Sequence, residues 1–150
     1  QNGISIAATN HHELLDSAIW RRFQTVIEMP KPELAEVASM IKNMPEFIDV
    51  SQIKPGQWKK VYDALLGLSY SDIKNILNNM VKKLVLKDEN KVKFTDILVE
   101  AYLFKNHGNY TMEQMVQYMI DHGVSQKQAS LYFNVSTRQI KNCLERSEKN

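Results

Sequence analysis

The first part of the chain places an asparagine and two arginines where they could act on an anion. Asn10 ends the apolar segment 4–9, and Arg21 and Arg22 follow a short stretch typical of a helix. An arginine side chain is planar and always charged, so its fork of donors suits phosphate or carboxylate groups. Simpler structural roles also fit, since asparagine is common in turns and cations are favourable at helix ends. The residues alone leave both interpretations open.

Composition limits the possible classes of protein. The 150 residues carry a formal net charge of +2 and suffice for one or two small domains with a modest core. Residues 50–110 are the basic part, with 10 Lys or Arg against 6 Asp or Glu, which a solvated helical surface explains more simply than an anion site. Cys143 is the single cysteine, which excludes an intrachain disulfide and favours a reducing compartment. No signal peptide or membrane-length apolar run is present, so we expect a cytoplasmic protein with no membrane partner.

The remaining pattern predicts a mainly α fold. Segments 4–8 and 25–29 are typical of short strands, and they are the only two. No metal site is predicted, because His11 and His12 are adjacent and no other ligand cluster supports them. Apolar residues recur at helical spacing elsewhere, at about residues 34–41, 58–65, 70–84, 96–102, 112–120, 126–133 and 137–146. Prolines, glycines and polar turns separate these helices and divide the chain into regions 1–31, 32–107 and 108–150.

The last region has the spacing of a helix-turn-helix. Ser125 with Gln128, and Ser136 with Gln139, form S-x-x-Q patterns typical of capping boxes. The two predicted helices are therefore separated by a very short turn. Asn134 falls where a left-handed residue is needed, and asparagine tolerates that conformation better than most residues.

The order of motifs in the first hundred residues resembles the second half of the AAA+ ATPase core, and in particular the AAA branch in the narrow sense. The resemblance rests on "AATN", "LD", "RRF" and "MPKPE", in that order. It covers about residues 3–105 and implies the end of an α/β ATPase core, with two short strands, followed by a four-helix lid in residues 32–107. The strand-end Asn10 would be sensor 1, which positions the attacking water. Arg21 and Arg22 would be arginine fingers that stabilise transition-state charge in a neighbouring subunit, and Asp16 would help to hold their helix in place.

The same resemblance implies a nucleotide contact from the lid. "GLSYSDI" (67–73) resembles the family's G-x-S-G-A-D-L, where the lid backs onto adenosine, so the contact carries over to Tyr70 and Ser71. Here Gly-Ala has become Tyr-Ser, and the bulky tyrosine alters the expected contact. The phosphate loop G-x-x-x-x-G-K-[ST] is missing, as is a strand ending in paired acids. The resemblance therefore implies a C-terminal fragment, inactive alone, of a ring-forming homo-oligomer that uses ATP and Mg²⁺ to remodel a protein or nucleic acid.

The partner of the C-terminal region stays open at this point. The outward face of its last helix would carry residues that suit phosphates and base edges, namely Ser136, Thr137, Arg138, Lys141 and Asn142. Compact three-helix units equally serve as protein-docking modules, and a protein partner could then contact the side of Met112, Met115 and Met119 if that side is exposed. The alternative to an ATPase part is therefore a helical module that binds DNA or protein.

Overall fold

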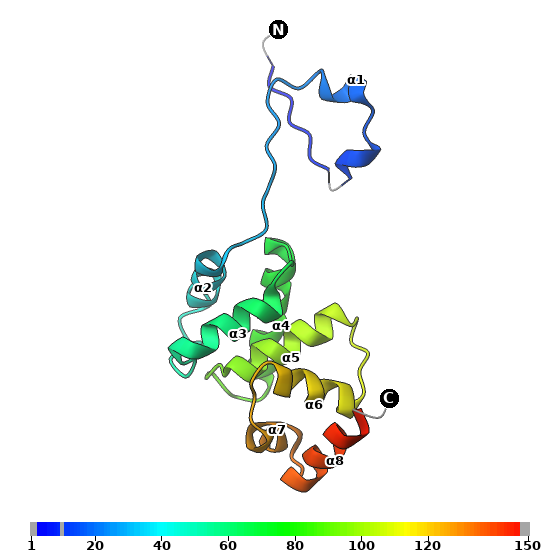
Figure 1. The fold of residues 1–150 in the computed structure, drawn as a ribbon. Helices are drawn as coiled ribbons and strands as arrows, with labels where there is room; N and C mark the ends of the chain where they lie inside the picture. The colour runs from blue at the N-terminus through cyan, green and yellow to red at the C-terminus, as the bar shows by residue number, and fades with distance from the viewer. Residues whose placement is uncertain (1–2, 10, 148–150) are drawn as a thin grey trace. The chain divides into compact units, whose positions relative to one another are not determined.

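The computed structural model describes residues 3–9 and 11–147, in two units. The N-terminal unit is Gln1–Pro30, and the second unit is Lys31–Asn150. Regular structure in the described residues is helical (Figure 1), which confirms the mainly α fold class. None of the helices in these ranges is long and apolar enough to span a membrane.

The N-terminal unit contains two short helical segments, the 3₁₀ helix η1 (His12–Leu14) and α1 (Ser17–Trp20). The prediction of strands at 4–8 and 25–29 was wrong for this chain, since neither described segment is a strand. A strand exists only through hydrogen bonds to a neighbouring strand. Among the described residues the β-type pairing is a single bridge, between Asp49 and Lys91 in the other unit.

The second unit begins with four helices, which we call the four-helix group. They are α2 (Leu34–Lys42), α3 (Pro55–Leu65), α4 (Tyr70–Leu86) and α5 (Phe94–Lys105). The positions of these helices match the prediction, whereas their assignment as an AAA+ lid stays a prediction. Between α2 and α3, the loop is held to the segment before α5 by hydrogen bonds from Asp49 N to Asn90 O (2.7 Å) and from Val92 N to Asp49 O (2.8 Å).

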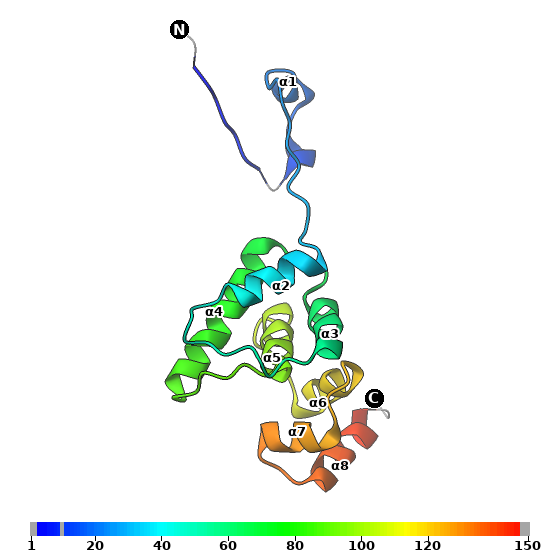
Figure 2. The same ribbon diagram turned by 90° about the vertical axis from the view of Figure 1, so that its left-hand side faces the viewer.

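Helix α5 lies at the centre of the second unit. It packs against α3, α4 and α6 (Figure 2), and its buried residues include Ile97, Leu98 and Val99, which are consecutive and therefore lie on different sides of the helix. A helix that is apolar on most sides must be covered on most sides. The sequence "FTDILVEAYLFK" therefore fits the central position.

Three further helices, which we call the tail, complete the second unit. They are α6 (Met112–Asp121), α7 (Gln126–Phe133) and α8 (Thr137–Ser147). Helix α6 packs against α5 on one side and against α7 and α8 on the other. The four-helix group and the tail thus share one compact unit, and the predicted division at residue 107 stays a prediction.

Candidate functional site

The two arginines lie directly after α1 in the N-terminal unit. Asp16 caps this helix, because its Oδ1 accepts a hydrogen bond of 2.9 Å from Ala18 N. The chain then continues through hydrogen bonds from Arg21 N to Ser17 O (3.3 Å) and from Arg22 N to Ile19 O (3.0 Å). Asp16 therefore stabilises the start of the helix that precedes both arginines, and its role in positioning them stays a prediction.

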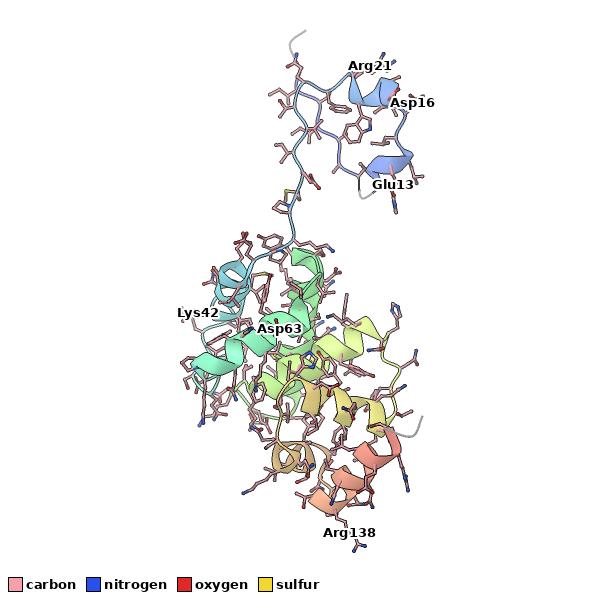
Figure 3. All side chains as sticks on the ribbon, viewed as in Figure 1. Glu13, Asp16, Arg21, Lys42, Asp63 and Arg138 are labelled. Atoms are coloured by element: carbon pink, nitrogen blue, oxygen red, sulfur yellow. The ribbon has the colours of Figure 1, made fainter. Side chains whose placement is uncertain are left out.

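Both arginine side chains are exposed to solvent, and Figure 3 labels Arg21 beside α1. Within the described part of the chain, neither guanidinium is in an ion pair. A residue that serves a neighbouring subunit must be available in this way. However, most of the N-terminal unit is exposed, including Ile4 (93%) and Ile6 (91%), so exposure alone does not distinguish the arginines. Asn10 lies outside the described residues.

Tyr70 and Ser71, the predicted nucleotide contacts, form the first turn of α4. Ser69 caps this helix through its Oγ, which accepts from Asp72 N at 3.2 Å. The Tyr70 hydroxyl is hydrogen-bonded to the Glu36 carboxylate of α2, which raises the pKa of Tyr70 and lowers the pKa of Glu36. Ser71 is exposed. The tyrosine that replaces a small family residue therefore already has a partner in this structure.

Two surface hollows of the described residues lie away from Tyr70 and Ser71. The larger, of about 330 Å³, is lined by Gln52 and by residues of the 88–93 turn. The smaller, of about 40 Å³, lies between α4, α5 and Tyr132 of α7. Neither hollow contains the residues that the resemblance assigns to adenosine, and the sequence holds no phosphate loop. The two hollows and the residues assigned to adenosine therefore lie at different places on the described part of this chain.

The tail contains the two short helices and the tight turn that its sequence predicts, whereas their assignment as a helix-turn-helix stays a prediction. Asn134 adopts the left-handed conformation at φ 53° and ψ 46° and ends α7. The predicted capping boxes are present, since Ser125 and Ser136 exchange hydrogen bonds with Gln128 and Gln139. The tail's buried core consists of Met115, Val116, Met119, Val124, Ala129, Ser130, Ile140 and Cys143. This geometry explains why two short helices are stable side by side.

The structure brings the five predicted contact residues of the last helix together on one exposed surface. Thr137, Arg138, Lys141 and Asn142 are exposed on α8, and Ser136 is exposed at its N-cap. Figure 3 shows Arg138 pointing away from the helices. By contrast, the condition for a protein contact through Met112, Met115 and Met119 is not met, because Met112 is half-buried and Met115 and Met119 are 1% and 0% exposed. These methionines face inward because they fill the space between α6 and its neighbouring helices.

Contacts between the four-helix group and the tail were missed from the sequence. Lys60 of α3 donates a hydrogen bond of 3.3 Å to the carbonyl of Gly123, just after α6. Tyr118 of α6 stacks between Tyr102 of α5 and His122, and burial beside Tyr102 raises the pKa of Tyr118 to about 12. Of these contacts, the sequence could have indicated only the one between Tyr118 and His122, which are four residues apart and therefore share one helix face.

A second cluster joins α4, α5 and α7. Lys83 pairs with Glu100, whose side chain is 9% exposed. Tyr132 of α7 and Asp96 of α5 line the same small hollow. Burial raises the pKa of Asp96, and burial together with Glu100 raises the pKa of Tyr132 to about 12. The charged groups here are engaged with one another, so we assign this cluster a structural role. In the described ranges, no three His, Cys, Asp or Glu residues are arranged to hold a metal ion.

Comparison with known proteins gives one relevant similarity. The chain is 31% identical over 98 residues to the uncharacterized AAA family ATPase y4kL of Sinorhizobium fredii. The similarity covers 63% of this chain and 27% of that protein, so the chain spans about a quarter of the relative's length. No protein-family model matches the chain. No solved structure matches it either. The similarity therefore supports a distant relationship to AAA family ATPases and nothing finer.

Proposed function

We propose that this chain is part of an AAA+ ATPase in which ATP hydrolysis drives the remodelling of a protein or nucleic-acid substrate. The observation that carries the proposal is the similarity to an AAA family ATPase, together with the family order of "AATN", "LD" and "RRF". The four helices α2–α5 follow these motifs, as a lid would. ATP and Mg²⁺ would be bound mainly by a phosphate loop that is absent from these 150 residues.

In this proposal the arginines act on a neighbouring subunit. Exposed guanidinium groups at Arg21 and Arg22 would approach the γ-phosphate in the next subunit of a ring and stabilise the charge that develops there. Asp16 would position them through its cap on α1. Asn10 would orient the attacking water, and Tyr70 and Ser71 would lie against the adenosine. When bound, the nucleotide would supply the phosphoryl group and its metal; the residues of this chain would supply orientation and charge.

The test is made in the whole ATPase subunit that contains this segment. We expect Arg21→Ala with Arg22→Ala to leave ATP binding unchanged and to lower turnover by about 10³-fold or more, because the loss falls on the transition state. Lys42→Ala, which removes an exposed charge from α2, serves as the matched control and should retain wild-type turnover. Turnover and binding are measured by phosphate release and by fluorescent-nucleotide titration.

A mixing experiment separates action in trans from a local defect. Subunits with both arginines replaced are combined with subunits whose phosphate loop is disabled, so that one kind of interface pairs an intact nucleotide site with intact arginines. Partial recovery of turnover is expected. Wild-type turnover in the double alanine variant would exclude the arginine-finger assignment, and the 150-residue chain alone should release no phosphate from ATP.

A further inference from the structure

The surface formed by α7 and α8 has an uneven distribution of charge. Residues 122–144 contain no Asp or Glu but include Lys127, Arg138 and Lys141, and all three basic residues are exposed. The whole chain is nearly neutral, so this is a local property of the helix-turn-helix. An exposed cationic surface without carboxylates attracts a polyanion.

The acidic residues of the tail that lie nearest in sequence to this basic region are on α6 and in the second half of α8. Glu113 of α6 approaches Arg146 near the end of α8, at 3.7 Å. Asp121, at the end of α6, accepts a hydrogen bond of 2.8 Å from Gln117. Glu145 lies in the second half of α8. The first half of α8 therefore carries two basic residues and no carboxylate, and the first acidic residue of this helix, Glu145, follows Lys141 by one turn.

The same half of α8 carries groups that can read bases. Arg138 and Asn142 are four residues apart and therefore share the side opposite the buried Ile140. Thr137 is exposed in the first turn. Arginine can bind guanine and asparagine can bind adenine with two hydrogen bonds each in the major groove, which is wide enough for one α-helix.

The helix starts add contacts for the backbone of the nucleic acid. In α8 the N–H of Gln139 is used by the Ser136 cap, which leaves the N–H groups of Thr137 and Arg138 without a partner within the helix. Lys127 is exposed in the first turn of α7. Helix N-termini favour phosphate groups, and the left-handed Asn134 ends α7 so that α8 can begin only three residues later.

We propose that the tail binds duplex DNA, with the first half of α8 in the major groove and with Lys127 and the start of α7 on the phosphate backbone. This goes beyond the proposed ATPase function and does not depend on it. The basic residues and the hydrogen-bonding groups are exposed on α7 and α8, whereas Met115, Val116 and Met119 of α6 are buried. One domain with three basic residues in this region binds weakly, so nearby copies in an assembly would strengthen the interaction.

The test is an NMR titration of the ¹⁵N-labelled 150-residue chain with a mixed-sequence duplex of about 20 base pairs, at a salt concentration of about 50 mM. We expect shifts in the amides of residues 125–129 and 136–142, with a Kd on the order of 10⁻⁶–10⁻⁴ M. Three cationic side chains that displace counterions from the duplex give a logarithmic salt slope of about −2.7, so the affinity should fall roughly 40-fold when the salt rises about fourfold. Double-stranded RNA should bind more weakly, because its major groove is too narrow for a helix.

Matched variants locate the surface. Arg138→Ala with Lys141→Ala should lower the affinity about tenfold or more and reduce the salt slope to about −0.9. Lys74→Ala with Lys82→Ala removes the same charge from exposed positions of α4 and should change the affinity less than twofold. Circular dichroism should show all variants folded. Absence of shifts in the wild type, equal loss in both double variants, or shifts confined to exposed Leu131 and Tyr132 would overturn the proposal.

Discussion

Tyr102 of α5 and Tyr118 of α6 stack across the junction between the four-helix group and the tail, with ring centroids 4.6 Å apart and planes at 50°. Tilted aromatic pairs at this distance contribute beyond the area they bury. The polar contact from Lys60 to the Gly123 carbonyl lies at the same junction. The structure therefore predicts that the two groups of helices depend on one another for stability.

Tyr102→Ala should weaken both groups of helices together. We expect a loss of about 2–4 kcal/mol, because a large aromatic side chain is removed from a packed junction. Hydrogen exchange should then accelerate in α4 as well as in α8. Tyr110→Ala, at a tyrosine that is 49% exposed, is the control and should have little effect. Acceleration confined to the tail would contradict the dependence.

Tyr118→Phe should raise the free energy of unfolding by up to about 1 kcal/mol. The Tyr118 hydroxyl is buried without a hydrogen-bond partner in the described structure, and a buried unsatisfied polar group costs free energy. Tyr70→Phe also removes a hydroxyl group, but one that is bonded to Glu36, so this variant should not raise the free energy of unfolding. Urea denaturation measures both variants. A clear loss of stability in Tyr118→Phe would show that the hydroxyl has a partner.

Asn134→Ala should cost about 1 kcal/mol or more, because alanine in the left-handed conformation brings its Cβ close to a carbonyl oxygen. Asn134→Gly should lie within about 0.5 kcal/mol of the wild type, since glycine adopts this conformation without that contact. Asn78→Ala, at an exposed position inside α4, is the control and should be neutral or slightly stabilising. Equal effects of alanine and glycine at position 134 would argue against the turn geometry.

Asp96→Asn should change how stability depends on pH. Burial raises the pKa of the Asp96 carboxyl above its ordinary value of 3.8, so the folded state favours the protonated form. The stability contributed by that form is complete below 3.8 and is lost as pH rises through the raised value. The asparagine variant lacks this titration. Its free energy of unfolding should therefore rise relative to that of the wild type as pH increases from acid to neutral.

Urea midpoints measured from about pH 3 to pH 7 test this expectation. The introduced amide would keep an oxygen acceptor for the hydrogen bond from Lys93 N, which is 2.8 Å long in the wild type, so the helix start is preserved. Asp63→Asn, at an exposed carboxylate of α3, is the matched control. A stability difference that stays constant with pH would exclude the buried carboxyl as its source.

Local signals in the sequence predicted most of the helices and the tail turn. Ser69, Ser125 and Ser136 each lie three residues before a residue that completes a capping box, and these patterns act within one turn of helix. The left-handed Asn134 follows from a similarly local rule. Such features can be predicted because the interacting atoms are close together in the chain.

Features that depend on distant partners could not be predicted in this way. The apolar segments 4–8 and 25–29 have strand composition but no ladder among the described residues. Helix α5 was expected to begin at about residue 96, yet it begins at Phe94 after Lys93, and Thr95 is buried. Helical spacing does indicate that Met115, Val116 and Met119 face inward on α6, and the structure has them buried, but the helices that cover them, α5, α7 and α8, could not be predicted from spacing. The predicted DNA-contact residues did prove exposed, whereas the assigned roles of Arg21, Arg22, Tyr70 and Ser71 remain predictions.

The central position of α5 has a mechanical consequence. This helix contacts α3, α4 and α6, and α6 in turn contacts α8. If these contacts are kept, a rotation of the four-helix group also rotates α6 and, with it, α8. Because α8 would lie farther from the axis of such a rotation than α5, its end would move farther. A small rotation of the four-helix group would then become a larger displacement of a duplex bound to α8.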